Sequence, residues 1–583
     1  MKEYDEVKCD VLVIGAGAAG LRTAIELHDR NVNVLVVSKA KKDDPHTILA
    51  TGGINASLGN MDPEDNWLYH AYDTMKEGVY LANPKAVELL CKNAVHAVNE
   101  LVKWGARFEK DKKTGKLVQR FFGAQLYRRA CFYGDYTGKE IVRVLTEQAK
   151  KRRIPYYPNI LITGLLKANN AVNGAIGIDL GRGRFLVFHS KCVLLAAGGY
   201  SRIYKRSSSR AYENFGDGIR LAYDAGAELQ DMEMTQFHPT GMIWPPEAEG
   251  ILVTEAVRGE GGKLFNARNE RFMKNYDATR MELGARDLVA RANYTEIIEG
   301  RGTEHGGVWL DITQLSKNYI LKRLPQMYKQ FKEYAKIDIN KERMEVAPTS
   351  HYSMGGVRVD HATGRTSVEN LFCIGENTGG LHGANRLGGN SLAETVVFGR
   401  LNGGHIAKYV KKIGWKKLNE TQIRKEMKNV KELFGTKGHM DPHELKREIQ
   451  EIIWEHVGIM RTEEGLETAL KEILDIKAHV ENGMMRVEGK KKGNQSLTDA
   501  LDVKAMVVTS EAVIKSALMR KESRGAHYRK DYQKTNDKKW RVNIIAKKAK
   551  YGMKLFTKKP PQIKGELKKI LSKEIEAKYH HLE

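Results

Sequence analysis

The sequence of 583 residues contains only five cysteines and no run of about twenty apolar residues. The cysteines stand far apart in the chain: Cys9, Cys91, Cys131, Cys192 and Cys373. No two are close enough in sequence to suggest a disulfide framework, a zinc site or an iron–sulfur ligand set. Any redox chemistry is therefore expected to depend on a bound organic cofactor.

Signals for secretion and membrane insertion are also missing. The N-terminus, MKEYDEVKCDVLVIG, lacks the apolar core and cleavage site of a signal peptide, and no segment is long enough to cross a bilayer. We therefore expect a soluble, cytoplasmic chain.

Positive charge is in excess and is concentrated near the C-terminus. The net charge is +24, and residues 501–583 contain 22 Lys and Arg against 9 Asp and Glu. No nucleic-acid recognition motif accompanies this charge, so we expect no nucleic-acid partner. A solvated tail, docking to a partner and attraction to an anionic membrane surface remain open for this region.

The chain is globular in composition, with 41% hydrophobic residues, and its length predicts two to four domains. A strand, a helix and a second strand open the sequence between residues 11 and 39. Residues 232–352 consist of mixed segments with many charged side chains, and a strand-like segment, NLFCIGE, returns at 370–376. This return predicts an α/β nucleotide-binding domain in two segments, 1–231 and 353–407. The other predicted parts are an inserted domain (232–352), a helical domain (408–530) and a basic C-terminal region (531–583).

The segment VIGAGAAGLRTA carries a G-x-G-x-x-G pattern between the first strand and the helix. Gly15 permits the tight turn, Gly17 lets a pyrophosphate approach the backbone, and Gly20 lets helix and strand pack closely. The acidic residue that often ends the second strand is missing, because Ser38 and Lys39 stand there. The pattern predicts a dinucleotide site, although no ribose-binding carboxylate can be assigned and a plain NAD site is disfavoured.

Three later glycine-rich segments suggest that one large cofactor is held by several loops. They are CVLLAAGGYSRIY at 192–204, NFGDGIRLAYDAGA with Asp217 at 214–227, and CIGENTGGLHGANRLGGNSLAE at 373–394.

Together these motifs resemble the flavoprotein subunit of the succinate dehydrogenase and fumarate reductase family, and the match runs from Gly15 to His527. The resemblance implies an α/β fold, with a Rossmann-like FAD-binding domain, an inserted α+β capping domain, a helical domain and a small C-terminal region. It implies FAD as the cofactor and no metal at the site. The implied FAD-binding residues are Gly15, Gly17, Ala18, Ala19, Gly20, Ser38, Lys39, His46, Thr47, Ala50, Thr51, Gly52, Gly53, Asp217, Glu376, Ser391 and Leu392.

The histidine in PHTILATGGINASLG (45–59) has a special place in this resemblance. In the family, the histidine of the matching segment is bonded to the 8α-methyl group of FAD, which implies covalent attachment through His46. A neutral imidazole is a nucleophile near physiological pH, which suits this reaction. A histidine that only packs against the flavin is the alternative.

Four further segments match the family's dicarboxylate site: TQFHPTG, VTEAVRGEGG, MELGARD, and SHYSMGG with GANRLGG. By resemblance, His238, Thr254, His351 and Arg386 bind the two carboxylates of succinate or fumarate. Arg286 is the implied proton donor, supplied through Glu255 and Arg258. A permanently protonated guanidinium suits the role of donor better than that of base.

The loop RFFGAQLYRRACFYGDYTG (120–138) departs from the family pattern at Ala124 and at Tyr133-Gly134, which leaves the choice of substrate open. L-Aspartate oxidase is an alternative, but that enzyme lacks the flavin-linking histidine and has a Glu where Phe122 stands. A thiol-linked fumarate reductase would share this flavoprotein. A flavin-binding scaffold without activity would be expected to have lost part of the substrate set.

The chain needs a partner to exchange electrons with its flavin, because it carries no cluster motif. The resemblance implies an iron–sulfur subunit, with membrane anchors beyond it as an open alternative that would place the chain on the cytoplasmic face of the membrane. The segment RKESRGAHYRKDY (520–532) also matches the family. We expect its Glu522, Arg524, His527 and Arg529 to form a structural polar network, with a partner-facing surface as the alternative.

Overall fold

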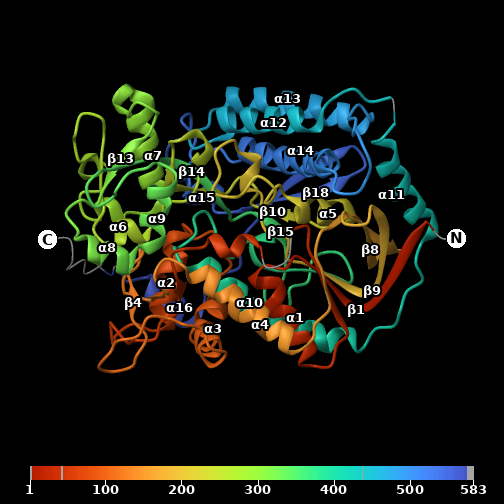
Figure 1. The fold of residues 1–583 in the computed structure, drawn as a ribbon, viewed down its shortest axis with the longest axis horizontal. Coiled ribbons are helices and arrows are strands. Elements are labelled where there is room, and N and C mark those ends of the chain that lie inside the picture. The colour runs from red at the N-terminus through yellow and green to blue at the C-terminus, as the bar shows by residue number, and fades with distance from the viewer. Residues whose placement is uncertain (1–2, 41–43, 436, 574, 576–583) are drawn as a thin grey trace.

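The computed structural model (Figure 1) describes residues 3–40, 44–435, 437–573 and 575. Its largest sheet has the strand order β6-β2-β1-β9-β8-β7, and β16 pairs with β9. The strands are β1 (Tyr4–Ile14), β2 (Val34–Val37), β6 (Tyr156–Tyr157), β7 (Ile160–Ala168), β8 (Ala171–Asp179), β9 (Arg184–Leu195) and β16 (Leu371–Cys373). β1 is parallel to β2 and β9, and its apolar residues 11–14 are all buried, as expected for a central parallel strand.

Helices from two distant parts of the chain pack together beside this sheet. α1 (Ala18–His28) packs against α10 (Asn390–Val410), and small residues allow the approach. A Cβ at Gly399 of α10 would lie 2.8 Å from the Cβ of Arg22 on α1. α2 (Trp67–Glu77), α3 (Pro84–Lys103) and α4 (Thr137–Lys151) gather on the same lower side in Figure 1.

The capping domain is inserted between β10 (Leu229–Gln230) and β15 (Gly356–Arg358). Its antiparallel sheet has the order β11-β14-β13-β12 and a hydrophobic core of its own. Its strands and main helices are β11 (Thr235–Met242), β12 (Lys263–Phe265), β13 (Val308–Asp311), β14 (Met344–Ser353), α6 (Ala256–Gly259), α7 (Arg286–Glu296), α8 (Lys317–Arg323) and α9 (Pro325–Glu333). The predicted boundary at 352/353 falls inside β14, and the exact domain limits stay predictions.

Most of the helical domain lies along the upper side of Figure 1, with α11 at the right edge. Its helices are α11 (Glu420–Glu432), α12 (Pro442–Val457), α13 (Glu463–Glu481) and α14 (Gln495–Met519). α12, α13 and α14 begin after Asp441, Thr462 and Asn494, whose side chains accept hydrogen bonds from first-turn N–H groups. α14 is buried on most of its faces, between the other helices and α5 (Asp217–Ala225).

The basic C-terminal region is folded over much of its length. β18 (Asn543–Ala549) and β19 (Gly552–Lys558) form a hairpin whose first strand pairs with β10. α15 (Asp537–Trp540) precedes the hairpin, and α16 (Gly565–Leu571) packs against α2. Residues 574 and 576–583 of this predicted region lie outside the described residues.

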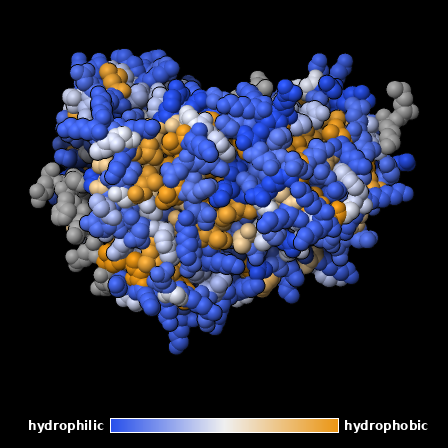
Figure 2. Space-filling model, turned by 90° about the horizontal axis from the view of Figure 1, so that it is seen from below, coloured by the Kyte–Doolittle hydropathy of each residue, from blue (hydrophilic) through white to orange (hydrophobic). Residues whose placement is uncertain are grey.

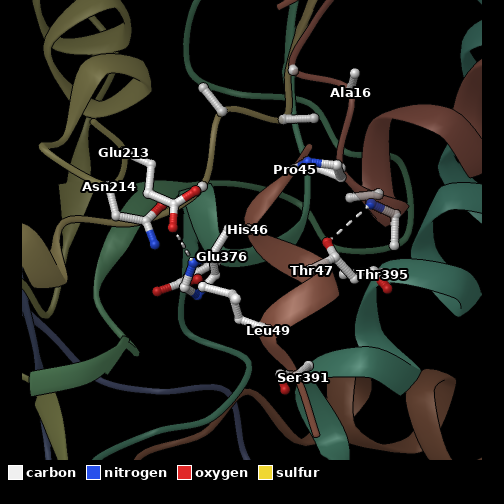
Figure 3. Close-up of a pocket in the computed structure, with 18 of the residues that line it drawn as sticks. Ala16, Pro45, His46, Thr47, Leu49, Glu213, Asn214, Glu376, Ser391 and Thr395 are labelled. Atoms are coloured by element: carbon white, nitrogen blue, oxygen red, sulfur yellow. Dashed lines mark hydrogen bonds and ion pairs between the residues drawn. The ribbon is translucent and has the colours of Figure 1, made fainter. Parts of the chain in front are cut away.

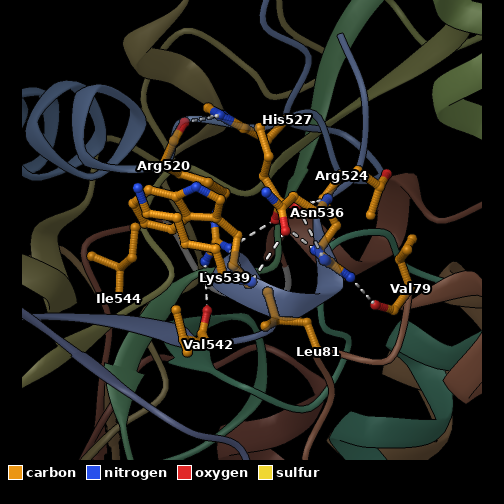
Figure 4. A network of polar contacts seen from close by, with 12 residues as sticks. Val79, Leu81, Arg520, Arg524, His527, Asn536, Lys539, Val542 and Ile544 are labelled. Carbon is orange, nitrogen blue, oxygen red and sulfur yellow. Dashed lines mark hydrogen bonds and ion pairs between the residues drawn. The ribbon is translucent and has the colours of Figure 1, made fainter. Parts of the chain in front are cut away.

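The segment 520–532 belongs to a buried network of charges (Figure 4). Nε of Arg524 and Nη1 of Arg520 donate to Oε1 of Glu522, at 2.7 and 3.2 Å. The N–H of Asn536 donates to Oε2 of the same carboxylate at 2.7 Å, and Nη1 of Arg524 donates to the carbonyl of Val79. Because Glu522 and both arginines are almost fully buried, this set joins three parts of the chain, as expected for a structural network.

The surface seen in Figure 2 is mainly hydrophilic, and its apolar areas are separated from one another. All five cysteines are buried and unpaired. Within the part of the chain that the structure describes, no helix is both long enough and apolar enough to cross a bilayer.

Candidate active site

A cavity of about 680 Å³ runs from the first βα turn to the capping domain. Every predicted site residue lines it except Gly20 and Arg258. Gly20 instead allows α1 to contact the strand turn, since a Cβ there would lie 1.9 Å from the carbonyl oxygen of Gly15. Arg258 lies behind Glu255, with 3.8 Å between its Nη2 and Oε1 of Glu255.

The glycine-rich end of the cavity has the geometry of a pyrophosphate site. Gly15 has a φ of 117°, in the region that favours glycine, and Gly17 precedes α1 without a capping side chain. The N-terminus of α1 therefore keeps most of its N–H groups available to an anion. Thr47 accepts a hydrogen bond from the N–H of Ala18 at 3.2 Å, which fastens the His46 segment to this turn (Figure 3).

Two carboxylates from distant parts of the chain surround Lys39, which follows β2 at a position where the local sequence has no acidic residue. The ammonium group of Lys39 lies 3.4 Å from Oδ2 of Asp217 and also pairs with Asp502 of α14. Burial opposes the charge of Lys39, but both aspartates outweigh it and raise its pKa above the usual value. Asp502 in turn pairs with Lys446 at 2.9 Å, so the helical domain contributes charges to this end of the cavity.

His46 begins a short 3₁₀ turn, residues His46–Leu49, after Pro45. Its Nδ1 lies 2.8 Å from Oε1 of Glu213, as Figure 3 shows. Burial by itself would lower the pKa of His46, but the carboxylates of Glu213 and Glu376 outweigh it and raise the pKa.

Small residues bring the backbone after His46 close to its neighbours. A Cβ at Gly52 would lie 2.8 Å from Cζ of Phe122, and one at Gly53 would lie 2.9 Å from the carbonyl oxygen of Cys131. The chain can therefore pass the cavity only with glycine at these two positions.

Arg286 and Glu255 form a buried ion pair at the other end of the cavity. Nε and Nη2 of Arg286, the first residue of α7, both donate to Oε2 of Glu255, the former at 2.8 Å. Burial would raise the pKa of Glu255, but Arg286 and Arg258 outweigh it and lower the pKa to about 2. Glu255 is therefore ionised at any physiological pH.

Gln236 connects this pair to the second arginine. Its Oε1 accepts from Nη1 of Arg286 at 3.1 Å and from Nη2 of Arg386 at 3.0 Å. Arg386 is buried, donates from Nη1 to Ser391 at 3.1 Å, and leaves Nε without a hydrogen-bond partner among the described residues. Burial, followed by the charge of Arg286, lowers the pKa of Arg386 to about 10, so it remains a cation at neutral pH.

The two predicted substrate histidines lie edge to face, with ring centroids 5.2 Å apart. Burial and the nearby arginines hold the pKa of His238 well below its usual range, and burial with His238 does the same for His351. Nδ1 of His238 lies 3.2 Å from the N–H of Thr240 and 2.9 Å from its carbonyl, and Ser208 contacts Nδ1 of His351 at 2.8 Å. The shorter contact fits Nδ1–H of His238 donating to the carbonyl of Thr240, which leaves Nε2 of the neutral ring as an acceptor. Nδ1 of His351 can instead accept from the hydroxyl of Ser208, which leaves the proton of that ring on Nε2.

These groups give the capping end of the cavity an excess of positive charge. Arg258 and Arg286 both pair with the carboxylate of Glu255, and Arg386 shares Gln236 with Arg286. Both histidines are neutral, because their pKa values are held well below the usual range. Thr254 adds a buried hydroxyl to the lining. An unpaired donor and a net positive charge suit a small dianion.

The divergent loop 120–138 closes against this end. The N–H of Gly123 donates to Oε1 of Glu255 at 2.8 Å, and Phe122 is buried beside Gly52. Ala124 has a φ of 62°, so alanine adopts the left-handed conformation that favours glycine. No carboxylate stands at position 122 to receive a substrate ammonium group.

Sequence reasoning missed Gln236, Glu213 and Asp502. Gln236 had a usable signal, because residues i and i+2 of a strand share a face and Gln236 precedes His238 by two. Glu213 and Asp502 had none, since they come from loops and helices far from their partners.

Comparison with known proteins agrees with these features. The family described as FAD binding domain matches residues 10–392, and that described as fumarate reductase flavoprotein C-term matches residues 446–570. The chain is a flavoprotein subunit of the succinate dehydrogenase and fumarate reductase family. It is an oxidoreductase and binds FAD, so the predicted family, fold class and cofactor are confirmed.

Similarity to individual members extends over almost the whole chain. The matching subunit of the fumarate reductase (CoM/CoB) of Methanothermobacter marburgensis is 42% identical over 93% of this chain and 98% of its own. The succinate dehydrogenase flavoprotein subunit of Rickettsia bellii is 36% identical over 96% of both chains. In structure, the chain is similar to a quinol fumarate reductase of E. coli, with a TM-score of 0.90, 29% identity and coverage of 96% of this chain and 99% of that one.

Proposed function

We propose that the chain interconverts succinate and fumarate. The observation that carries the proposal is the arrangement of Arg286 and Arg386 around Gln236, with Glu255 behind one arginine and His238 and His351 beside them. FAD, when bound, accepts or supplies the hydride. The proposed roles are those predicted from the sequence. The substrate-binding residues are His238, Thr254, His351 and Arg386, and the proton-transfer residues are Arg286, Glu255 and Arg258.

The two ends of the dianion would be held by different groups. Arg386 can donate to one carboxylate through its unpaired Nε, while His351 and Thr254 offer donors for the other and His238 lines the same end of the cavity. Binding in this way places the central carbons between the arginines and excludes water from a largely buried site.

Arg286 is the proposed proton donor in fumarate reduction. Its guanidinium is charged, and the ionised Glu255 holds it by two nitrogens, so its remaining N–H groups keep a fixed direction. Arg258 lies 3.8 Å behind Glu255 and donates to the carbonyl of Glu282 at 2.5 Å, which provides a route for proton resupply. In succinate oxidation the same groups would carry the proton outwards.

We further propose that FAD is bonded covalently to His46 and that electrons pass to an iron–sulfur partner subunit. Both of the relatives from Methanothermobacter and Rickettsia are subunits of larger enzymes, which supports the need for a partner. Membrane association would then be peripheral and through partner subunits, on the cytoplasmic face.

The thiol-linked variant is a second candidate for the electron partner. The observation that favours it is the 42% identity to one of the subunits of fumarate reductase (CoM/CoB). In that case the flavoprotein would act as a fumarate reductase, with electrons from thiols arriving through the partner. L-Aspartate oxidation is disfavoured, because the buried Phe122 offers no partner for an ammonium group.

A dye-linked assay of the purified, FAD-loaded chain tests the proposal. Succinate with an oxidising dye and fumarate with a reduced viologen should both support turnover, whereas L-aspartate should not. Malonate and oxaloacetate should perturb the flavin spectrum, since they carry two carboxylates at similar spacing. Turnover with L-aspartate alone, or no spectral change at millimolar dicarboxylate, would reject the proposed substrate.

A further inference from the structure

The imidazole of His46 is fixed from one side by a carboxylate that no sequence motif indicates. Nδ1 of His46 lies 2.8 Å from Oε1 of Glu213, and the two residues are 167 positions apart. The side chain of Glu213 is 12% exposed and that of His46 27% exposed. Figure 3 shows this contact beside the 3₁₀ turn that begins at His46.

Glu213 is itself held in place by Arg210. The backbone N–H, Nε and Nη2 of Arg210 all donate to its carboxylate, at 2.9, 3.2 and 3.0 Å. Arg210 also pairs with Asp44, two residues before His46, and Tyr212 donates to Asp44 at 2.7 Å. Burial would raise the pKa of Glu213, but His46 and Arg210 outweigh it and lower the pKa to about 2.

This contact determines which ring nitrogen of His46 can react. An ionised carboxylate can only accept, so it keeps a proton on Nδ1 and leaves the lone pair of the neutral ring on Nε2. Among the described residues, Nε2 makes no hydrogen bond or ion pair, and His46 lines the cavity. Carboxylates orient reactive and metal-bound histidines by the same contact.

We propose that Glu213 is a positioning residue for flavin attachment, which fixes His46 in the tautomer whose Nε2 bonds to the 8α carbon of FAD. The inference rests on the covalent attachment proposed above. In that reaction the Nε2–C8α bond forms and an 8α C–H bond breaks. The 8α proton passes to solvent and the electron pair remains on the flavin ring, which fumarate or dioxygen then reoxidises. The imidazole becomes a cation when Nε2 forms the bond, its charge is balanced by the carboxylate of Glu213, and it becomes neutral when the Nδ1 proton is lost to solvent.

The surroundings of His46 also predict how attachment depends on pH. The charged and titratable groups that face it are Glu213, Glu376, Arg210 and His351. Their combined effect raises the pKa of His46, and only the neutral ring has a lone pair on Nε2. Attachment should therefore accelerate as pH rises through this raised pKa and reach a plateau above it.

The test uses the full-length chain, made without FAD in riboflavin-deprived cells and incubated with FAD and fumarate in a cell extract that supplies maturation factors. Samples are precipitated with acid, and protein-bound flavin is measured by fluorescence after gel electrophoresis. On the plateau the ring is neutral in every variant, so rate differences there report its orientation. Glu213→Ala should lower the plateau rate by about tenfold or more. Glu213→Asp should restore part of it.

Glu249→Ala is the matched control. Glu249 pairs with Arg206 at 2.9 Å and makes no contact with His46, so this variant should attach FAD at the wild-type rate. Loss of Glu213 should also move the midpoint of the pH profile below the ordinary histidine value of 6.5, because burial then acts without this carboxylate, whereas a general loss of packing would return it only to 6.5.

The outcomes separate this inference from the proposals on which it rests. Equal plateau rates in wild type, Glu213→Ala and Glu213→Asp would overturn the role of Glu213 and leave the attachment intact. Absence of bound flavin in wild type would overturn both, while viologen-linked fumarate reduction still tests the substrate separately. If Glu213→Ala does not fold, Glu213→Asp decides, because its shorter side chain draws the carboxylate away from Nδ1 of His46, and a wild-type plateau rate in that variant contradicts the inference.

Discussion

Arg286 contacts one oxygen of Glu255 through two of its nitrogens, Nε and Nη2. The pair is almost fully buried, and the other oxygen of Glu255 accepts from Gly123 of the loop 120–138. One carboxylate therefore fixes both the proposed proton donor and the loop beside it. The geometry makes this pair the most sensitive point of the proposed chemistry.

We expect Arg286→Lys to lower fumarate reduction by roughly 100-fold or more, because lysine cannot reproduce the two contacts and places its proton elsewhere. The measurement is viologen-linked turnover on protein with its flavin content determined. Arg182→Lys is the control and should retain activity, because the side chain of Arg182 is 76% exposed and lies 3.7 Å from its partner Asp179. Near-normal turnover of Arg286→Lys would reject Arg286 as the donor.

Gln236→Leu should disturb both arginines at once, because its Oε1 is the common acceptor for Arg286 and Arg386. Loss of two charge-assisted hydrogen bonds is expected to lower kcat/KM for fumarate by about 10- to 100-fold. FAD content should not change. Gln236→Glu should raise KM chiefly, since a new negative charge would compete with the dianion. A normal kcat/KM in both variants would show that Gln236 does not position the arginines.

His46→Ser should leave FAD bound but release it on acid precipitation. We expect succinate oxidation to fall more than fumarate reduction, because loss of the linked imidazole lowers the flavin potential and makes the flavin a weaker oxidant. Both directions are measured with dyes on protein of equal flavin content. Equal loss in the two directions would indicate that the link does not tune the potential.

His361 links stability to pH. It is buried, neither ring nitrogen has a hydrogen-bond partner among the described residues, and burial lowers its pKa to about 4 from an ordinary 6.5. The unfolded chain therefore binds a proton at this residue below pH 6.5 that the folded chain does not, and stability falls as pH decreases towards 4. His361→Leu removes this dependence.

Denaturant titrations at several pH values measure that effect. Between pH 8 and 5, the free energy of unfolding should shift in favour of His361→Leu by about 2 kcal/mol relative to wild type. A pair of titrations at pH 8, above both pKa values, gives the baseline difference. A difference that is constant with pH would contradict the buried, neutral state of His361.

Glu522→Gln should destabilise the chain by about 3–5 kcal/mol, because it leaves two buried guanidinium groups without their shared carboxylate. Thermal unfolding of the FAD-loaded protein measures this. Glu432→Gln is the control. Lys428 and Glu432 form an ion pair in which they are 75% and 61% exposed, so loss of the pair should lower the free energy of unfolding by about 0.5 kcal/mol or less. A small effect at Glu522 would mean that the network in Figure 4 does not hold its three segments together.

The parts of the site that follow from local sequence were predictable, and those that depend on distant pairing were not. The turn at Gly15 and the polar segments around His238 and Arg286 have local signatures, and their residues line one cavity. Lys39 shows the limit, since its partner Asp502 is 463 residues away on α14 and no local pattern connects them.

The C-terminal region shows a different limit. Its many lysines suggested a basic tail, yet β18 contains near its start the consecutive buried residues Ile544, Ile545 and Ala546, and β18 and β19 form a hairpin on β10. High charge obscured the strand periodicity, because exposed faces of edge strands are commonly rich in lysine.

The pairing of β9 with β16 and of α1 with α10 determines when these elements can meet their partners during translation. The first strands and α1 emerge early, but their partners emerge only when synthesis has passed residue 410, after the whole capping domain. Until then the nascent chain exposes apolar surface of α1, which is a target for chaperones. FAD therefore meets a complete pocket only late in translation, and a ribosome stalled within the capping domain would carry a nascent chain unable to retain the cofactor.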